Sequence, residues 1–215
     1  MATWITHLRI AQNFINDGVV PPKYATEFYE GSVAPDCGYG EKDSFGDFNP
    51  PPSVTHWAPD GTKVFCDYKS FYDIYLSDKP KDSKYYFYFG YYIHLICDTL
   101  WSTMIYMPNK IKYKSEYDRD PMFLNVVKKD WYDNDFKFLQ ENEEFIPYKA
   151  LTVINAVGDY LPYYEDGQLT VQIKYIADYY KDFNNHPTNR IYPYLTCDEI
   201  DEFINVATEL IKFKI

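Results

Sequence analysis

The segment from Tyr88 to Trp101 most constrains the fold, because it is almost wholly apolar yet carries His94 and Asp98. Residues four apart lie on one face of an α-helix, so the imidazole and the carboxylate share a stripe of the predicted helix. Burying either group without a partner is costly. A hydrogen bond between the two groups and a shared metal ion both satisfy them, and a metal ion requires further ligands.

Two more histidines lie in segments suited to presenting a side chain. We expect His7 near the first turn of an amphipathic helix over residues 5–17, where apolar residues repeat at helical spacing. His56 follows the proline-rich stretch 50–55, which predicts a stiff, extended approach to a loop imidazole. Together with His94, these are three of the four histidines in the chain.

A second carboxylate, Asp36, lies directly after Pro35, whose ring fixes the backbone before it. Gly31 is a natural stop for a helix predicted over residues 22–31. We expect Asp36 and His56 to lie on a long loop between residues 35 and 59. A long loop without secondary structure in a compact domain is more often functional than idle.

These elements, in this order, resemble the zinc-dependent phospholipase C-like family, which shares its all-helical fold with the fungal single-strand nucleases. The resemblance is strongest over residues 3–102 and is only general beyond them, where the helix pattern carries it. It rests on four elements: a Thr-His pair at 6–7, a Gly-x-x-x-Pro-Asp element at 31–36, a second Thr-His pair at 55–56, and an aromatic helix that carries Gly90, His94 and Asp98.

The resemblance implies an all-α fold, a single multihelical domain over residues 1–215 with the metal site among its central helices. It implies one or two zinc ions. The first would be held by Asp36, His56, His94 and Asp98, and the second by His7, the shared Asp98 and backbone groups of the N-terminal residue. It also gives Asp36 a catalytic role as the general base that deprotonates the attacking water.

A third zinc site, which the resemblance attaches to full phospholipase activity, would need two further histidines and a glutamate after the central helix. His186 is the only later histidine, and we interpret it as a solvated loop side chain. Carboxylates from an acidic run over residues 118–135 could substitute for missing ligands, and such oxygen ligands would favour manganese, iron or magnesium over zinc. A solvated helix face is the simpler interpretation of that run, which comprises Asp118, Asp120, Asp130, Asp133 and Asp135.

Composition limits the function classes. The net charge of −11 argues against nucleic acid as a partner, because gripping a phosphate backbone requires clustered cations. The four cysteines form no Cys-x-x-Cys pair and the N-terminal residues lack the pattern of a secretory signal, so we expect free thiols and a cytoplasmic protein. No apolar run is long enough for a transmembrane segment. The sequence does not indicate an oligomeric state.

The function that best fits these observations is that of a metal-dependent phosphoester hydrolase, phospholipase C-like, which uses metal-activated water on a small phosphoester or a phospholipid headgroup. A phosphatase or phosphodiesterase acting on a small soluble substrate is one alternative. A non-catalytic, metal-stabilised binding protein is the other, because a fold resemblance alone does not establish catalysis. Further helices are predicted over residues 67–77, 82–105, 120–144, 147–158, 168–182 and 197–213.

Overall fold

The structure, a computed structural model, describes residues 1–40, 48–184 and 186–215. Helices make up most of the described chain, and the strands described there form one short antiparallel pair, β1 (Tyr39–Gly40) with β2 (Phe48–Asn49). The predicted all-α class is confirmed. Part of the loop predicted between residues 35 and 59 lies outside the described residues.

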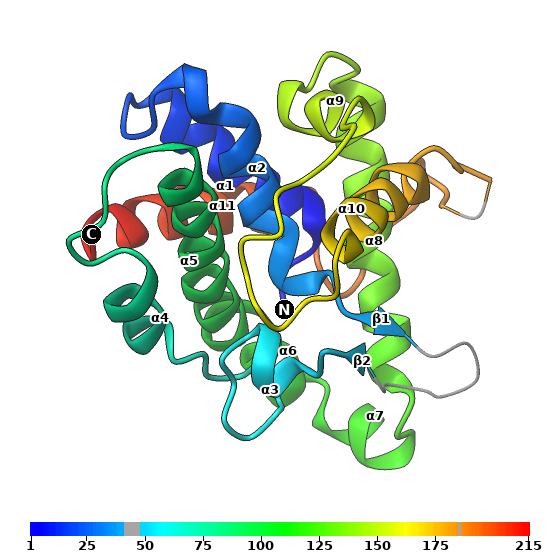
Figure 1. Ribbon diagram of the computed structural model, residues 1–215. Helices are drawn as coiled ribbons and strands as arrows, with labels where there is room; N and C mark the ends of the chain where they lie inside the picture. Colours follow the sequence, from blue (N-terminus) through cyan, green and yellow to red (C-terminus); the bar gives the residue numbers. More distant parts are fainter. Residues whose placement is uncertain (41–47, 185) are drawn as a thin grey trace.

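Helices follow one another along the whole chain (Figure 1). The first half contains α1 (Trp4–Asn16), the 3-10 turn η1 (Pro22–Tyr24), α2 (Ala25–Val33), the 3-10 turn η2 (Ala34–Asp36), α3 (Pro52–Thr55), α4 (Tyr68–Tyr75) and α5 (Ser83–Trp101). The second half contains the π-helical segment η3 (Ser102–Tyr106), α6 (Met107–Lys112), α7 (Lys114–Arg119), α8 (Phe123–Glu141), α9 (Ile146–Thr152), α10 (Gln168–Tyr179) and α11 (Cys197–Lys212).

The predicted helix over residues 120–144 begins differently in the structure. Asp120 has an extended backbone, φ −130° and ψ 105°, and separates α7 from α8. The residue before a proline is driven out of the helical region, and Pro121 follows Asp120. The helix predicted over residues 147–158 ends earlier in the structure, at Thr152, because the β-branched residues at the end of α9 disfavour continuation. The short helices α3, α6 and α7 are not among the predicted ones.

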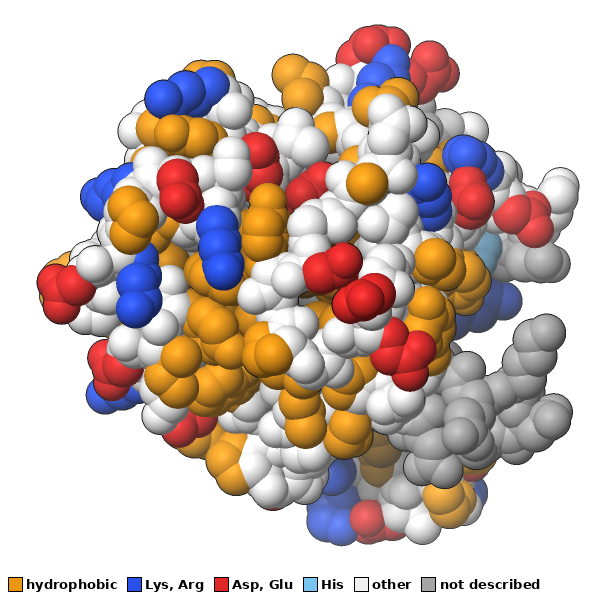
Figure 2. Space-filling view, in the orientation of Figure 1, with side chains coloured by type: hydrophobic (Ala, Val, Ile, Leu, Met, Phe, Trp, Pro, Cys, Tyr) orange, Lys and Arg blue, Asp and Glu red, His pale blue; other side chains and the backbone are white. Residues whose placement is uncertain are grey.

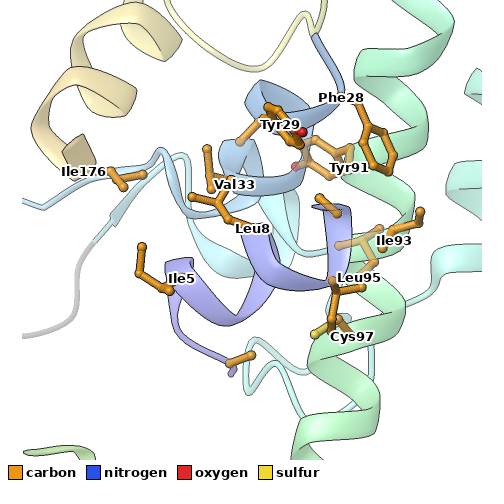
Figure 3. Close-up of a cluster of buried hydrophobic side chains, with 14 of the residues drawn as sticks. Ile5, Leu8, Phe28, Tyr29, Val33, Tyr91, Ile93, Leu95, Cys97 and Ile176 are labelled. Carbon is orange, nitrogen blue, oxygen red and sulfur yellow. The ribbon is translucent and has the colours of Figure 1, made fainter. Parts of the chain in front are cut away.

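Helix α5 lies at the centre of the fold, and every residue from Tyr86 to Asp98 is buried. A helix that is buried on all sides must be covered by other elements. Helices α1, α2, α4 and α11 all pack against α5. Figure 3 shows this core where Leu8 of α1, Val33 of α2 and Leu95 of α5 contribute side chains. In the described chain, no helix is both long enough and apolar enough to cross a membrane.

Gly31 does not end a helix, as the sequence suggested, because α2 continues through it to Val33. Its role is to let α2 approach α5. A Cβ atom on Gly31 would lie 1.9 Å from the carbonyl oxygen of Phe87, and a Cβ atom on Gly90 would lie 2.2 Å from the carbonyl oxygen of Phe28. Each glycine therefore faces the backbone of the other helix, and neither position has room for a side chain.

We expect Gly31→Ala to destabilise the protein by about 1–3 kcal/mol or more, because the new methyl group meets backbone atoms that cannot rotate away. The same change in an exposed helix would stabilise by roughly 0.5–1 kcal/mol. Urea denaturation measures the difference. Thr26→Ala, on the exposed side of α2, is the matched control and should change the free energy of unfolding by less than about 0.5 kcal/mol. An unchanged Gly31→Ala variant would contradict the close packing.

Candidate metal centre

Helix α5 presents His94 and Asp98 on one face, as their spacing predicts. The distance from His94 Nε2 to Asp98 Oδ2 is 3.6 Å, and both side chains are fully buried. His94 Nδ1 lies 2.8 Å from the backbone carbonyl oxygen of Ser32 on α2. A ring nitrogen that donates to a carbonyl fixes the tautomer, so Nε2 is left as a lone-pair donor that faces Asp98.

Helix α1 supplies His7. The Thr3 hydroxyl caps the start of α1 and sets His7 within the first helical turn, as predicted. His7 Nε2 lies 3.4 Å from Asp98 Oδ1, and its ring stacks on His94 with the ring centres 3.7 Å apart. The backbone N–H of Ala2 donates to the same Asp98 oxygen, at 2.9 Å.

His56 follows a helical turn and not the predicted extended approach. The prolines of this segment begin α3, since a proline at the first helical positions loses no internal hydrogen bond. His56 Nδ1 lies 2.8 Å from the Thr55 hydroxyl, which turns Nε2 toward two carboxylates. The distances from Nε2 are 3.1 Å to Asp36 Oδ1 and 3.6 Å to Asp98 Oδ2.

Asp36 ends the turn η2, which continues directly from α2. Its Oδ1 accepts a hydrogen bond from Lys63 Nζ at 3.0 Å. Although burial opposes ionisation, Lys63 and the hydrogen bond from His56 hold the pKa of Asp36 well below its usual range. No feature of the sequence distinguishes Lys63 from the other lysines, so the prediction from sequence did not include it.

The structure therefore brings all five predicted donors together, in two overlapping groups. One group is His7, His94 and Asp98, and the other is Asp36, His56 and His94; within each group the donor atoms lie within 4.8 Å of one another. His94 belongs to both groups. Figure 2 shows almost no histidine surface on the face that it draws, in keeping with the burial of these three imidazoles.

Several of these donor atoms have no partner in the described chain. Both ring nitrogens of His7, Nε2 of His94 and Oδ2 of Asp98 are buried and accept or donate no hydrogen bond there. Buried polar atoms are nearly always satisfied, so a cluster of free ones indicates a missing partner. Imidazole nitrogens and carboxylate oxygens at this separation suit a zinc ion.

Residues 6–106 match the family model described as zinc dependent phospholipase C. The matched segment contains all five donors, and the resemblance inferred from the motifs is confirmed. No curated protein and no solved structure gives a significant match to the chain. The name of the zinc dependent phospholipase C family supports zinc as the metal, and the buried donor groups are consistent with it.

The electrostatics of the centre suit a metal ion. Burial lowers the pKa of His7 to about 4, with the nearby His94 adding to the effect. Burial and then Lys63 lower the pKa of His56 to about 3. Both imidazoles are neutral at pH 7 and offer lone pairs, which is the form that binds metal.

His186 is not the solvated loop residue that the sequence suggested. Its Nδ1 lies 2.9 Å from Asp133 Oδ1, and its ring stacks on Phe136 with the ring centres 3.9 Å apart. Arg190 also contacts Asp133, at 2.6 Å. This structural cluster anchors the 186–190 segment to α8 and is separate from both donor groups of the zinc dependent phospholipase C segment.

The acidic run divides into two parts. Asp118 and Asp120 are exposed, as a solvated face requires, but Asp130, Asp133 and Asp135 are buried, so that interpretation is wrong for these three. Each has internal partners: the backbone of Tyr194 for Asp130, His186 for Asp133, and the Thr3 and Tyr180 hydroxyls for Asp135. None belongs to either described donor group.

The shared position of His94 predicts how metal content responds to substitution. We expect His94→Ala to lower metal below about one tenth of the wild-type content, because three protein ligands are the usual minimum for zinc and both groups lose a member. His7→Ala should retain the ion of the Asp36 group. Elemental analysis of protein purified without chelator measures the content. His186→Ala, the matched control, should keep it, and a metal-replete His94→Ala variant would refute the assignment.

The low pKa of His7 predicts a pH-dependent stability difference in chelator. The unfolded histidine takes up a proton near pH 6.5 and the folded one only near pH 4, so its contribution is lost as pH falls below 6.5. Relative to His7→Gln, wild type should lose roughly 1.5 kcal/mol of stability in total between pH 6.5 and 5. Burial raises the pKa of Asp135 to about 7, and this shift makes the folded state more stable as pH falls, opposite to the effect of His7. Wild type and His7→Gln both carry Asp135, so the difference between them isolates the contribution of His7. A constant difference in urea denaturation would contradict this.

Proposed function

We propose that this protein is a metal-dependent phosphoester hydrolase of the phospholipase C type. The observation that carries the proposal is the set of five donors beside a cavity, four of them buried and Asp36 half-buried, with several donor atoms that have no partner in the described chain. This set would hold one or two zinc ions through His7, Asp36, His56, His94 and Asp98. When bound, a divalent ion lowers the pKa of water and stabilises negative charge on phosphoryl oxygens.

The cavity has a volume of about 200 Å³ and reaches the donors through Asp36. Of the five donor residues, Asp36 is the one that lines this cavity in the described chain. Lys63, Lys128 and Tyr132 lie on its wall, together with the first four residues of the chain. A phosphoester in the cavity would therefore meet Asp36 and two ammonium groups before any of the histidines.

Asp36 is the proposed general base. The described hydrogen bonds to its carboxylate, from His56 and Lys63, both engage Oδ1. Oδ2 is then available to orient a water molecule in the cavity and to accept its proton. Lys63 acts as a positioning residue, because its ion pair fixes the carboxylate between the histidine cluster and the cavity.

The substrate class follows from the cavity and its rim. Phe48 lines this cavity and is 46% exposed, and Val64, which is 37% exposed, lines a neighbouring cavity that shares Lys63 and Lys128 with it. Apolar side chains beside a phosphate site favour a phosphoester with an organic moiety, and a phospholipid headgroup is the proposed substrate. All four cysteines lie in the described chain as free thiols, which supports the cytoplasm as the proposed compartment.

We expect Asp36→Asn to lower turnover of a phosphodiester by roughly 10²–10⁴-fold, because the amide keeps one oxygen for the metal but accepts no proton. The measurement is the rate at matched metal occupancy across pH 5–9. The full profile is needed because loss of one negative charge can lower the pKa of the attacking water and restore rate at low pH.

Asp73→Asn is the matched control, since Asp73 is exposed on α4 and the substitution removes the same charge. It should keep wild-type turnover. Wild-type turnover in Asp36→Asn would remove Asp36 as the base. Hydrolysis restricted to water-soluble esters would favour the phosphatase or phosphodiesterase alternative. Failure of the metal-loaded protein to cleave any phosphoester would favour the binding protein.

A further inference from the structure

The face of α5 that carries His94 and Asp98 continues beyond Asp98. Ser102 follows Asp98 by four residues, and its side chain is 1% exposed. It begins the π-helical segment η3, and π turns inside α-helices are frequent at functional sites. The Ser102 hydroxyl has no hydrogen-bond partner in the described chain. It lines a second cavity, of about 300 Å³.

The second cavity adjoins the first. Lys63, Lys128 and Trp131 line both, so these side chains stand at their junction. Trp131 is 2% exposed, and its indole N–H is another buried donor without a partner in the described chain. Two buried hydrogen-bond donors, on α8 and at the end of α5, thus lack acceptors beside the same space.

The junction also carries positive charge. Lys63 and Lys128 line both cavities and Lys110 lines the second. Asp36 is paired with Lys63, whereas no described carboxylate forms an ion pair with Lys128. Burial lowers the pKa of Lys128, and the charge of Lys63 lowers it further. The chain as a whole has a net charge of −11, so these three lysines form a locally positive region in an acidic protein.

We propose that the second cavity is a subsite for a second anionic group of the substrate, held by Lys128, the Trp131 indole N–H and the Ser102 hydroxyl. The inference rests on the proposed function, because it places the scissile phosphate in the first cavity. The substrate is then a phosphoester with a further phosphate or carboxylate, and not one with a cationic choline-type headgroup. An anion there would supply acceptors to both free donors and a counter-charge to Lys128.

A pair of inert ligands tests the subsite without turnover. Propane-1,3-diphosphonate carries two anionic groups and propylphosphonate carries one, and neither has a phosphoester bond. We expect the metal-loaded full chain to bind the diphosphonate at least about tenfold more tightly, measured by titration calorimetry with metal retention checked, because charge-assisted hydrogen bonds are among the strong ones. Equal affinities in wild type would overturn the proposal.

Substitutions locate the effect. Lys128→Gln should weaken diphosphonate binding more than propylphosphonate binding, and so remove most of the preference. Lys129→Gln removes the same charge from the exposed neighbouring residue and should keep the preference. Trp131→Phe, which keeps an aromatic ring but loses the five-membered ring with its N–H, should lower the preference severalfold, and serves if Lys128→Gln folds poorly. An equal loss in the Lys129 variant would show a general charge effect and refute the subsite.

Hydrolysis identifies the source of the anionic group. Wild-type protein should cleave phosphatidylinositol 4-phosphate faster than phosphatidylcholine in the same detergent micelles, or glycerophosphoinositol 4-phosphate faster than glycerophosphocholine if the substrate is soluble. A preference for the choline compounds would contradict the subsite. Absence of all hydrolysis would contradict the proposed function alone, because the diphosphonate titration still tests the subsite.

Discussion

The close crossing of α2 and α5 is the constraint on which the site depends. Gly31 and Gly90 each bring their helix against the backbone of the other. The residue after Gly31 is Ser32, whose carbonyl oxygen orients His94, and His94 itself lies one turn beyond Gly90. The same backbone then continues through η2 to Asp36. A wider crossing would separate His94 from its carbonyl partner and Asp36 from His56.

Around that crossing lie buried polar groups that have no hydrogen-bond partner among the described residues. The imidazoles of His7 and His94, the fully buried carboxylate of Asp98 and the indole of Trp131 lie on α1, α5 and α8. Natural proteins tolerate such local conflicts where function requires them, and the rest of the core is conventional. Apolar and aromatic side chains fill the remaining interhelical space, as in the packing of Trp101 on Trp131 and Phe203.

Sequence reasoning selected five residues that the structure brings together, because ligand chemistry depends on residue type, order and helical spacing. His94 and Asp98 illustrate this, since their separation by four residues fixes their common face. The role of Gly31 was missed because glycine is favoured both at the end of a helix and where two helix backbones come close together. The burial of Asp130, Asp133 and Asp135 was missed because their partners lie far along the chain. The two lysines that line both cavities, Lys63 and Lys128, were not identified, since only the fold brings them to the same space.

The donor set also has a topological meaning. Its members lie on α1, η2 and α5 and, for His56, directly after α3, so coordination to one centre would close loops that together span residues 7 to 98. The entropy lost by an unfolded chain on such closure grows slowly with loop length, as it does for disulfides. All four cysteines lie within the described residues, and all four are free thiols. Coordination of the proposed ion would take the place of covalent cross-linking, and the lifetime of the folded state would then depend on the rate at which these ligands dissociate from it.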